Sequence, residues 1–598
     1  MWLINTQSLA LQEFVDPSSV EYAILSHTWE DEEVTFQDIN NLEQSGVRLK
    51  TGFSKIVKTC EIARQMDLRF AWVDTCCIDK SSSAELSEAI NSMFSWYKHS
   101  TVCFVFLSDL PALENSVLQP NSARRFPYSQ ETFGACRWFS RGWTLQELIA
   151  PDHVEFFNSR WEQFCRKYDC LEILSDITGI SRSVLKSSSS LRRTPIAVKM
   201  SWAASRQTKR IEDRAYSLLG IFDINMPMIY GEGHKAFRRL QEEVARETND
   251  LSLFAWRAAL IEGGGAQVFR GIFARSPAEF STCSGMRRSS TGIEPQREFT
   301  LTNKGVRFET KLYKHTQGAY VMYLGFTIHG NVPVCIFLKR TVDGFIRSEP
   351  WSMECEETIA DVDKHRGVFT VYVQKEVSLQ EDLGFQKRMH RSFRISIGFP
   401  TSLKLETIEP SPEYLWDRFH STFISNDPDK SFAAKLHIVV RGTDGTFNET
   451  FPLTLTLGWT STLQKPFAVL YGTEQSTKMA KRSIQNVPPS DFPDLVKDDV
   501  DWERSHENEF EHTISRVCLD PRLQSKEVHF IDGKMMVLHR GIRKSSAWAA
   551  NFKVELETHE GDNGVVTYCA SLSGELAKLE GRDAVMNAYS YVPGRLEL

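Results

Sequence analysis

The chain has 598 residues, of which 41% are hydrophobic and 25% are charged, and its formal net charge at pH 7 is -7. This composition is typical of folded globular proteins, and the length favours about three or four domains. The acidic balance excludes a general nucleic-acid-binding protein. No apolar run approaches the ~18 residues of a membrane span, and the first residues lack a secretory signal pattern. We therefore expect a cytoplasmic protein with no membrane span and no nucleic-acid partner.

The twelve cysteines are too sparse for a framework of disulfide bonds. Several of them lie within apolar runs, where free thiols are usually buried. Cys76 and Cys77 are adjacent, whereas zinc sites commonly use the spacing C-x-x-C. We therefore expect buried free thiols and no metal site.

Three short apolar runs, each followed by polar residues, predict three buried strands in the first part of the chain. These runs are residues 22–26, 70–73 and 101–107. Apolar residues at helical spacing fill residues 53–66, between the first two strands. Ser82 and then Glu85 form a capping box that opens a second helix before the third strand. Alternating strands and helices are typical of an α/β domain with a parallel sheet.

Ligands of such sheets bind beyond the carboxyl ends of the strands. The residues that follow the predicted strands are therefore candidate site residues, and they combine aromatic rings, a histidine and carboxylates. They are Ser26, His27 and Trp29 after the first strand, Asp74 and Asp79 after the second, and Ser108 after the third.

Within the stretch 137–151, the sequence predicts a short helix that follows Arg141 and Gly142 and that Pro151 ends after about two turns. Trp143 and Glu147 are four residues apart, so they share one face of this helix. An aromatic ring beside a carboxylate fits a flat, cationic substrate group. The alternative is that Trp143 belongs to the core and that Glu147 is a solvated or capping carboxylate.

After the α/β part, the sequence predicts a helical extension and then a β-rich region. Residues 212–220 predict a helix that Gly220 stops. From about Phe254 onward, short alternating runs are separated by turn signals such as Asp343-Gly344, which favours antiparallel, sandwich-like sheets. We expect an α/β domain over 1–185, its helical extension over 186–256, a β-rich domain over 257–385 and a β-sandwich-like domain over 386–598.

Several blocks resemble the signature blocks of the fungal heterokaryon-incompatibility (HET) domain. They are residues 22–29 (YAILSHTW), 72–79 (WVDTCCID), 83–93 (SAELSEAINSM) and 141–148 (RGWTLQEL). Residues 213–220 (DRAYSLLG) and 229–233 (IYGEG) resemble the blocks that usually follow. The resemblance spans residues 1–256. It implies an effector that triggers programmed cell death after non-self recognition, acting as a homo-oligomer with a non-self or allelic protein partner.

The HET domain in turn resembles, more distantly, the TIR domain, and this implies a TIR/flavodoxin-like parallel sheet. Residues 25–31 look like the TIR first strand, and residues 143–148 look like the helix motif W-C-x-x-E-L, with Thr144 in place of cysteine. TIR enzymes hydrolyse NAD at the nicotinamide–ribose bond, so NAD or a related nucleotide is the implied substrate, with no other cofactor. The resemblance assigns the catalytic carboxylate to Glu147. The implied substrate-binding residues are Ser26 and His27 at the ribose or amide, Trp29 or Trp143 against the flat ring, and Asp74, Asp79 and Ser108 at the rim.

Two other hypotheses stay open. The first is a non-enzymatic, self-associating death or signalling adaptor, in which the same residues form an interface or a core. The position of Glu147 distinguishes it from the enzyme, because an adaptor would bury Glu147 against Arg137, Arg141 or Arg214. The second is a cysteine nucleophile, Cys76 or Cys77, with His27 as its base.

Overall fold

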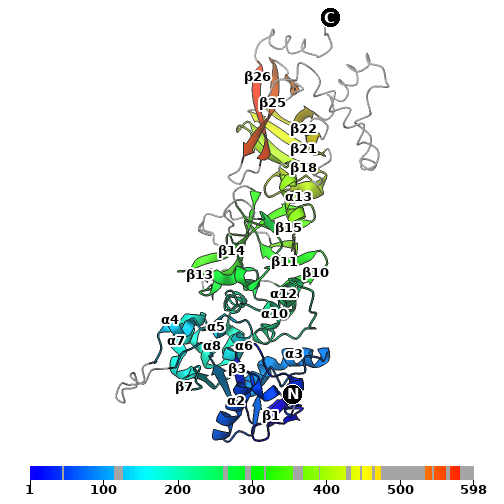
Figure 1. Ribbon diagram of the computed structural model, residues 1–598. Coiled ribbons are helices and arrows are strands. Elements are labelled where there is room, and N and C mark those ends of the chain that lie inside the picture. Colours follow the sequence, from blue (N-terminus) through cyan, green and yellow to red (C-terminus); the bar gives the residue numbers. More distant parts are fainter. Residues whose placement is uncertain are drawn as a thin grey trace.

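The structure, a computed structural model, describes fourteen stretches of the chain. They are residues 1–43, 46–112, 126–259, 267–289, 298–315, 318–353, 368–389, 391–425, 432–444, 447–460, 465–472, 533–541, 544–560 and 566–579. The described part is elongated, with the N-terminal sheet at one end and the last β-strands at the other (Figure 1).

The N-terminal sheet has seven strands in the order β2-β1-β4-β3-β5-β6-β7. Strands β4, β3, β5 and β6 are parallel, whereas β1 pairs antiparallel with β4, and β7 pairs antiparallel with β6. The predicted α/β domain with a parallel sheet is therefore confirmed for the centre of the sheet, and antiparallel strands flank it. The bounds are β1 (Trp2–Asn5), β2 (Leu11–Glu13), β3 (Tyr22–His27), β4 (Phe70–Trp72), β5 (Val102–Phe106), β6 (Val154–Phe157) and β7 (Gln163–Arg166).

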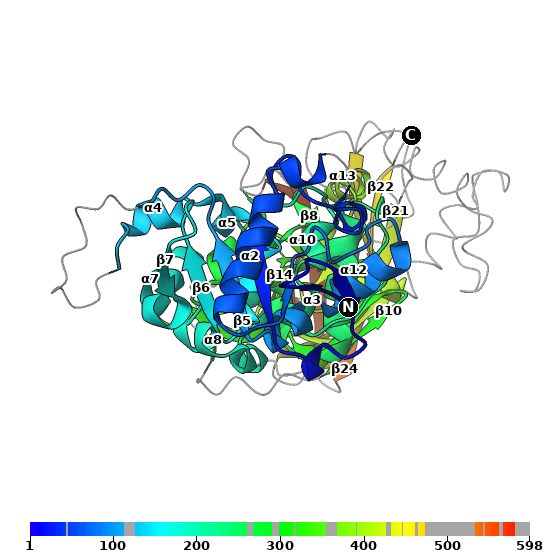
Figure 2. The same ribbon diagram turned by 60° about the horizontal axis from the view of Figure 1, so that its bottom comes forward.

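Numbered along the chain, the parallel strands lie in the order 2-1-3-4, which is a doubly wound arrangement. The chain leaves β3 toward β4 and then returns across the sheet to β5, so the winding direction reverses at β3. Right-handed crossovers then place α2 (Phe53–Gln65) on one face and α3 (Ser83–His99) with α6 (Thr144–Ile149) on the other. Figure 2 shows α2 against the sheet. The carboxyl ends of β3 and β5 therefore border the crevice in which such sheets bind ligands.

Strand β3 is buried along its whole length, and its side chains alternate between the two faces. The Tyr22 hydroxyl donates to the Trp96 carbonyl of α3, whereas His27 contacts Lys55 of α2. Ser26 shares the face of Tyr22, so Ser26 and His27 point to opposite sides of the sheet. The alternation thus separates two candidate residues that are adjacent in the sequence.

The helix starts follow the predicted capping in part. The Ser82 side chain accepts from the Glu85 backbone N–H at 3.3 Å, as a capping box requires. The Glu85 carboxylate instead accepts from the backbone N–H of Asp79 at 2.9 Å. The remaining helices before β6 are α1 (Phe36–Ile39), α4 (Gln130–Gly134) and α5 (Arg137–Ser140).

A helical layer follows β7 and packs on the N-terminal sheet (Figure 1). It comprises α7 (Leu171–Thr178), α8 (Arg182–Lys186), α9 (Ile196–Ser201), α10 (Asp213–Tyr216), α11 (Leu219–Phe222) and α12 (Lys235–Glu247). The predicted helix stop at Gly220 is wrong, because Gly220 lies inside α11. A Cβ atom added there would lie 2.1 Å from the Cβ of Phe94 in α3. Gly220 therefore permits close packing of two helices.

The β-rich region begins with a nine-stranded sheet that shares its hydrophobic core with the preceding parts, from Leu3 to Val373. The hairpin predicted at Asp343-Gly344 is confirmed, since it joins β14 to β15. The domain boundaries after residues 185, 256 and 385 stay predictions. The strands are β8 (Phe269–Arg270), β9 (Arg287–Arg288), β10 (Phe299–Thr302), β11 (Gly305–Lys311), β12 (Tyr313–Lys314), β13 (Tyr320–Ile328), β14 (Val332–Thr341), β15 (Gly344–Ser348) and β16 (Val368–Val373).

Beyond α13 (Leu379–Met389), a six-stranded and a four-stranded sheet contribute to a second hydrophobic core. Most pairs are antiparallel, but β17 pairs parallel with β26, as β15 does with β16. The sandwich-like arrangement stays a prediction. The strands are β17 (Phe393–Gly398), β18 (Leu403–Ser411), β19 (Trp416–Asp417), β20 (Thr422–Phe423), β21 (Phe432–Asp444), β22 (Phe447–Thr460), β23 (Lys465–Gly472), β24 (Gly533–Gly541), β25 (Lys544–Glu560) and β26 (Val566–Leu579).

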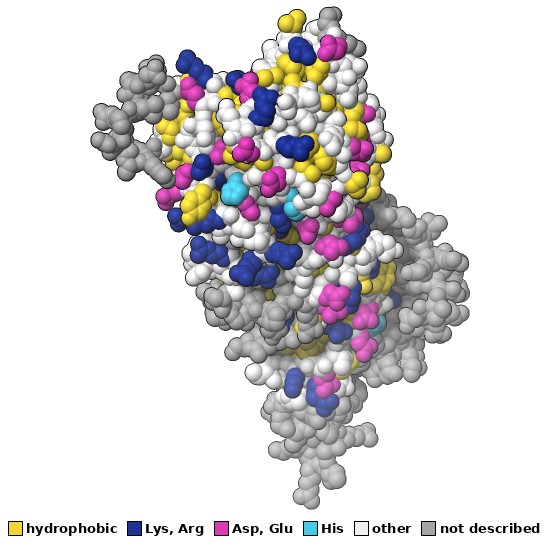
Figure 3. All heavy atoms as spheres, turned by 90° about the horizontal axis from the view of Figure 1, so that it is seen from below, with side chains coloured by type: hydrophobic (Ala, Val, Ile, Leu, Met, Phe, Trp, Pro, Cys, Tyr) yellow, Lys and Arg dark blue, Asp and Glu magenta, His cyan; other side chains and the backbone are white. Residues whose placement is uncertain are grey.

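The surface at the N-terminal end carries interspersed charges of both signs (Figure 3). Within the described ranges, no helix combines the length and the apolar character needed to cross a membrane.

Candidate functional site

Ser26 links two buried side chains at the carboxyl end of β3. The indole Nε1 of Trp138, in α5, donates to Ser26 Oγ at 2.7 Å, and the Ser26 hydroxyl donates to Glu147 Oε2 of α6. Because an indole nitrogen can only donate, Ser26 must accept from Trp138 and can direct its own hydrogen at the carboxylate. The three residues form the inner cluster of the site, and all are buried.

The pKa of Glu147 is raised to about 7, first by burial and then by the negative charge of Asp74. Hydrogen bonds with Ser26 and Tyr97 and the positive charge of Arg141 oppose this rise. The side chain is thus poised between its neutral and ionised forms at neutral pH, which is the range that suits proton transfer.

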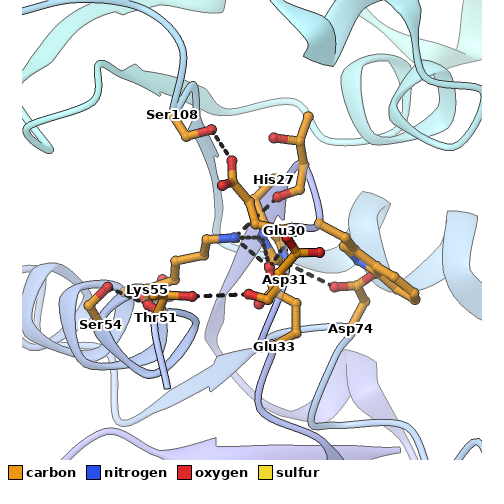
Figure 4. A network of polar contacts seen from close by, with 12 residues as sticks. His27, Glu30, Asp31, Glu33, Thr51, Ser54, Lys55, Asp74 and Ser108 are labelled. Carbon is orange, nitrogen blue, oxygen red and sulfur yellow. Dashed lines mark hydrogen bonds and ion pairs between the residues drawn. The ribbon is translucent and has the colours of Figure 1, made fainter. Parts of the chain in front are cut away.

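A second network lies on the α2 face of the sheet and is drawn in Figure 4. His27 Nε2 lies 3.2 Å from Asp74 Oδ1, and Lys55 Nζ lies 3.3 Å from His27 Nδ1. Which ring nitrogen of His27 donates depends on its protonation. Lys55 also donates to Glu33 at 2.5 Å and to the Thr28 carbonyl at 3.2 Å. His27 therefore lies between the Lys55 side chain and the Asp74 carboxylate.

Asp74 connects this outer network to the rim. It accepts the Trp29 indole N–H at 2.8 Å. Burial alone would raise the pKa of Asp74, but the hydrogen bond and the positive charge of His27, the charge of Lys80 and the hydrogen bond from Trp29 outweigh burial and lower it to about 2. Asp74 is therefore ionised at neutral pH, whereas Glu147 is partly neutral. Two nearby carboxyl groups with separated pKa values are a common arrangement in acid–base sites.

Trp29 is half-buried and has two cations near its ring. Lys80 Nζ lies 3.8 Å from the ring centroid, and the Arg141 guanidinium carbon lies 5.9 Å from it. Farther along the rim, the Ser108 hydroxyl and Arg137 Nη2 each donate to Glu30 at 2.8 Å. An aromatic ring and several exposed or half-exposed cations thus border the half-buried Asp74 and the buried Glu147.

The remaining predicted site residues have other partners. Trp143 precedes α6, and its side chain acts on Asp213, whose pKa it lowers and which accepts from the Tyr230 hydroxyl at 3.0 Å. The Asp79 carboxylate accepts from the Ser81 backbone N–H at 2.9 Å, within the loop before α3. The structure therefore brings Ser26, His27, Trp29, Asp74 and Glu147 into connected networks, with Ser108 at their rim, whereas Trp143 and Asp79 lie in separate contacts.

The comparisons with known proteins concern this same region. Residues 22–147 match the family described as "Heterokaryon incompatibility protein (HET)". This N-terminal stretch is similar to that family, and we call residues 22–147 the HET domain. The match begins at the first residue of β3 and ends at Glu147, so it spans the edge of the sheet on which both clusters lie.

The chain is also similar to a curated protein. The chain is 43% identical over 234 residues to the vegetative incompatibility protein HET-E-1 of Podospora anserina. That stretch covers 39% of this chain and 16% of the relative, so the chain matches only a small part of the relative's length. Residues 235–267 match a domain of unknown function, DUF8212. No solved structure matches the chain.

Several residues of the HET domain site were not predicted from the sequence. Lys55 is 7% exposed although it sits in a helix whose apolar spacing was recognised. The signal in the sequence that could have indicated its burial is a lysine among the apolar positions of that helix. Tyr97 and Trp138 were also missed, since a buried aromatic residue with a polar partner looks like any core residue in the sequence.

The positions of Glu147, Cys76 and Cys77 bear on the two open hypotheses. Glu147 is 6% exposed, as an adaptor would require, but its hydrogen-bond partner is Ser26 and no ion pair with Arg137 or Arg214 forms among the described residues. Cys76 and Cys77 are buried, and burial raises the pKa of the Cys76 thiol well above its ordinary value. A protonated, buried thiol is a poor nucleophile. Within the described residues, no group of three or more histidine, cysteine or carboxylate side chains is arranged to hold a metal ion.

Proposed function

We propose that this chain acts in heterokaryon incompatibility as a cytoplasmic effector whose HET domain triggers programmed cell death after recognition of a non-self partner. The HET domain and the 43% identity to a vegetative incompatibility protein support this role.

The reaction that we propose for the HET domain is hydrolysis of NAD at the nicotinamide–ribose bond, which the resemblance to TIR enzymes implies. The observation that carries it is the buried Glu147, whose pKa is about 7, at the edge where the doubly wound sheet reverses direction. The bond from the ribose to the nicotinamide nitrogen breaks, and its electron pair leaves with neutral nicotinamide. Water then supplies the hydroxyl group on the ribose and releases a proton.

Glu147 suits both stages of this reaction. In its ionised form it stabilises the positive charge that develops on the ribose, as carboxylates do in glycoside hydrolysis. With a pKa near 7 it also accepts the proton of the attacking water. Ser26, fixed by Trp138, holds the carboxylate in place during these steps.

The outer rim supplies the binding groups in this proposal. The Trp29 ring offers a face for the flat nicotinamide or adenine. Lys80 and Arg141, which lie near that ring, complement the negative charges of the pyrophosphate. Ionised Asp74 attracts the positively charged nicotinamide ring.

Substrate access requires a change of conformation, because Glu147 is 6% exposed and lies beneath buried side chains. Movement of the turn between α5 and α6 would uncover it. We propose that self-association into a homo-oligomer causes this movement, so that activity depends on assembly.

Purified protein tests this reaction through the release of nicotinamide from NAD over a series of protein concentrations. We expect wild type to show activity that rises more steeply than in proportion to concentration, and Glu147→Gln to lose it. Glu172→Gln is a matched control, because the Glu172 side chain is 80% exposed. Equal activity in Glu147→Gln and wild type would overturn the assignment of Glu147.

The second candidate is a non-enzymatic, self-associating death module, which the burial of Glu147 and its satisfied contact with Ser26 favour. This candidate predicts no turnover of NAD at any concentration, together with cell death on expression of either wild type or Glu147→Gln.

A further inference from the structure

A segment well beyond the HET family match pairs with the turn that leads into α6. The backbone N–H of Gln207 donates to the Ser140 carbonyl at 2.6 Å, and the N–H of Gly142 donates to the Gln207 carbonyl at 2.8 Å. Arg141 and Gln207 form an isolated parallel β-bridge. Residues 206–208 therefore bind the turn 140–142 through its backbone, and we call them the bracing segment.

The fit between these two segments is tight. A Cβ atom added to Gly142 would lie 2.5 Å from Thr208 Cγ2 and 3.3 Å from Ser217 Oγ. Only a glycine lets the turn approach the bracing segment this closely. The position of the turn, and of the helix that it starts, therefore depends on residues about 60 positions later in the chain.

Arg206 extends this contact into the first turn of α6. Its Nη1 donates to the Arg141 carbonyl at 2.8 Å and to Thr144 Oγ1 at 3.0 Å, and its Nε donates to the Trp202 carbonyl at 3.2 Å. The Thr144 hydroxyl in turn donates to the Trp138 carbonyl at 2.5 Å. Arg206 is thus connected to both helices that carry the inner cluster.

The charge of Arg206 is buried, since the residue is 8% exposed. No carboxylate lies within 4.0 Å of its guanidinium among the residues that the structure describes. Burial lowers the pKa of Arg206 to about 10, and the charge of Glu147 opposes this effect. An unpaired buried cation is costly unless an anion nearby compensates for it.

We propose that Arg206 is a positioning residue for Glu147, which holds the first turn of α6 and supplies the buried positive charge that favours the ionised carboxylate. The working unit of the HET domain therefore extends beyond Glu147 to at least Thr208. The role of Arg206 in NAD cleavage rests on the proposed function, but the coupling between the charges of Arg206 and Glu147 does not.

Charged and titratable groups from every neighbouring element act on Glu147, and the test has to separate Arg206 from them. They are Asp74 after β4, Tyr97 of α3, Cys103 of β5 and Arg141 of the turn, together with Arg206 itself. A cycle of four proteins isolates one pair, because the other groups are present in each of them.

The experiment compares thermal unfolding of wild type, Glu147→Gln, Arg206→Gln and the double variant between pH 4 and pH 9. A carboxyl group whose folded pKa is raised is favourable at low pH and loses stability as pH rises from its unfolded pKa to its folded pKa. Wild type should therefore lose stability relative to Glu147→Gln up to about pH 7. In the Arg206→Gln background, the pH at which this loss of stability ends should rise by about one unit, because one nearby opposite charge is removed.

Arg206→Lys keeps the charge and should return the end of this loss to about pH 7, as in wild type. An equal change in melting temperature at every pH, with and without Glu147, would make Arg206 a purely structural residue and overturn the proposal. If Arg206→Gln fails to fold, Arg206→Met, which also removes the charge, replaces it in the same two backgrounds, wild type and Glu147→Gln. An end of the loss that stays at about pH 7 in Arg206→Met would then overturn the coupling.

The readout contains no NAD, so the two proposals fail separately. Loss of the NAD reaction with intact coupling overturns only the proposed function. Absent coupling with an active enzyme overturns only the role of Arg206.

Discussion

Ser26 donates its hydroxyl hydrogen to the carboxylate of Glu147, a residue 121 positions later in the chain. This contact fixes α6 on the carboxyl end of β3. Because the Trp138 indole can only donate to Ser26 Oγ, the Ser26 hydrogen stays available for Glu147. The relationship makes Ser26 both a structural link and a partner whose hydrogen bond opposes the rise in the pKa of Glu147.

Ser26→Ala should destabilise the protein by about 1–3 kcal/mol, because it leaves the buried Trp138 N–H and the Glu147 carboxyl group without this partner. Equilibrium unfolding in urea measures the change. Ser108→Ala is the control, since Ser108 lies at the rim and bonds to the exposed Glu30. Similar losses for both variants would contradict the assigned role of Ser26.

Asp74→Asn should lower stability at neutral pH by about 2 kcal/mol, which follows from a pKa held near 2 instead of about 3.9 in the unfolded chain. A carboxyl group with a lowered folded pKa stabilises the protein above its unfolded pKa, and this contribution is lost as pH falls toward the folded pKa. The difference between wild type and Asp74→Asn should therefore shrink between about pH 4 and pH 2. Unfolding curves over this range check it, and a difference that stays constant would show that the negative charge of Asp74 is not its cause.

Gly142→Ala should destabilise the protein by about 1–3 kcal/mol, since its Cβ would overlap Thr208 Cγ2. Thr208→Ser removes that methyl group and keeps a hydroxyl, so the double variant should recover most of the loss. Gly285→Ala provides a control, because nothing lies within 4 Å of its added Cβ. A double variant no more stable than Gly142→Ala would show that the strain arises elsewhere.

The central strands could be predicted from the sequence because their apolar runs are continuous and each is followed by polar residues. The edge strands were missed. Strand β2 (Leu11–Glu13), for example, is short and largely exposed, so it carries no periodic signal. Likewise, the helix of Glu147 was predicted from its glycine start and proline end.

The surroundings of Glu147 could not be predicted in the same way. Helical spacing placed Trp143 and Glu147 on one face, but the direction of that face depends on how α6 packs. In the structure Glu147 meets Ser26, whereas Trp143 meets Asp213. The contacts of Arg206 join residues about 60 positions apart, and no local pattern encodes them.

The β-rich part is fixed to the helical layer by Arg347, which is fully buried. Its Nη1 and Nη2 donate to the carbonyls of Phe254 and Trp256 at 2.9 and 2.5 Å, and its guanidinium carbon lies 3.7 Å from the Trp256 ring centroid. Lysine cannot reproduce this planar, forked contact. Arg347→Lys should therefore cost about 2–3 kcal/mol in urea unfolding, whereas Arg287→Lys, at an exposed position, should change stability by less than about 0.5 kcal/mol.

The most direct test of NAD cleavage by the HET domain is to express the chain in fungal cells and to follow cellular NAD and viability together. Wild type, Glu147→Gln and the exposed control Glu172→Gln are compared at equal protein levels. We predict that NAD falls before cells die with wild type and with Glu172→Gln, and that neither event occurs with Glu147→Gln. Cell death at constant NAD, or death caused equally by Glu147→Gln, would contradict the proposed reaction and favour the non-enzymatic module.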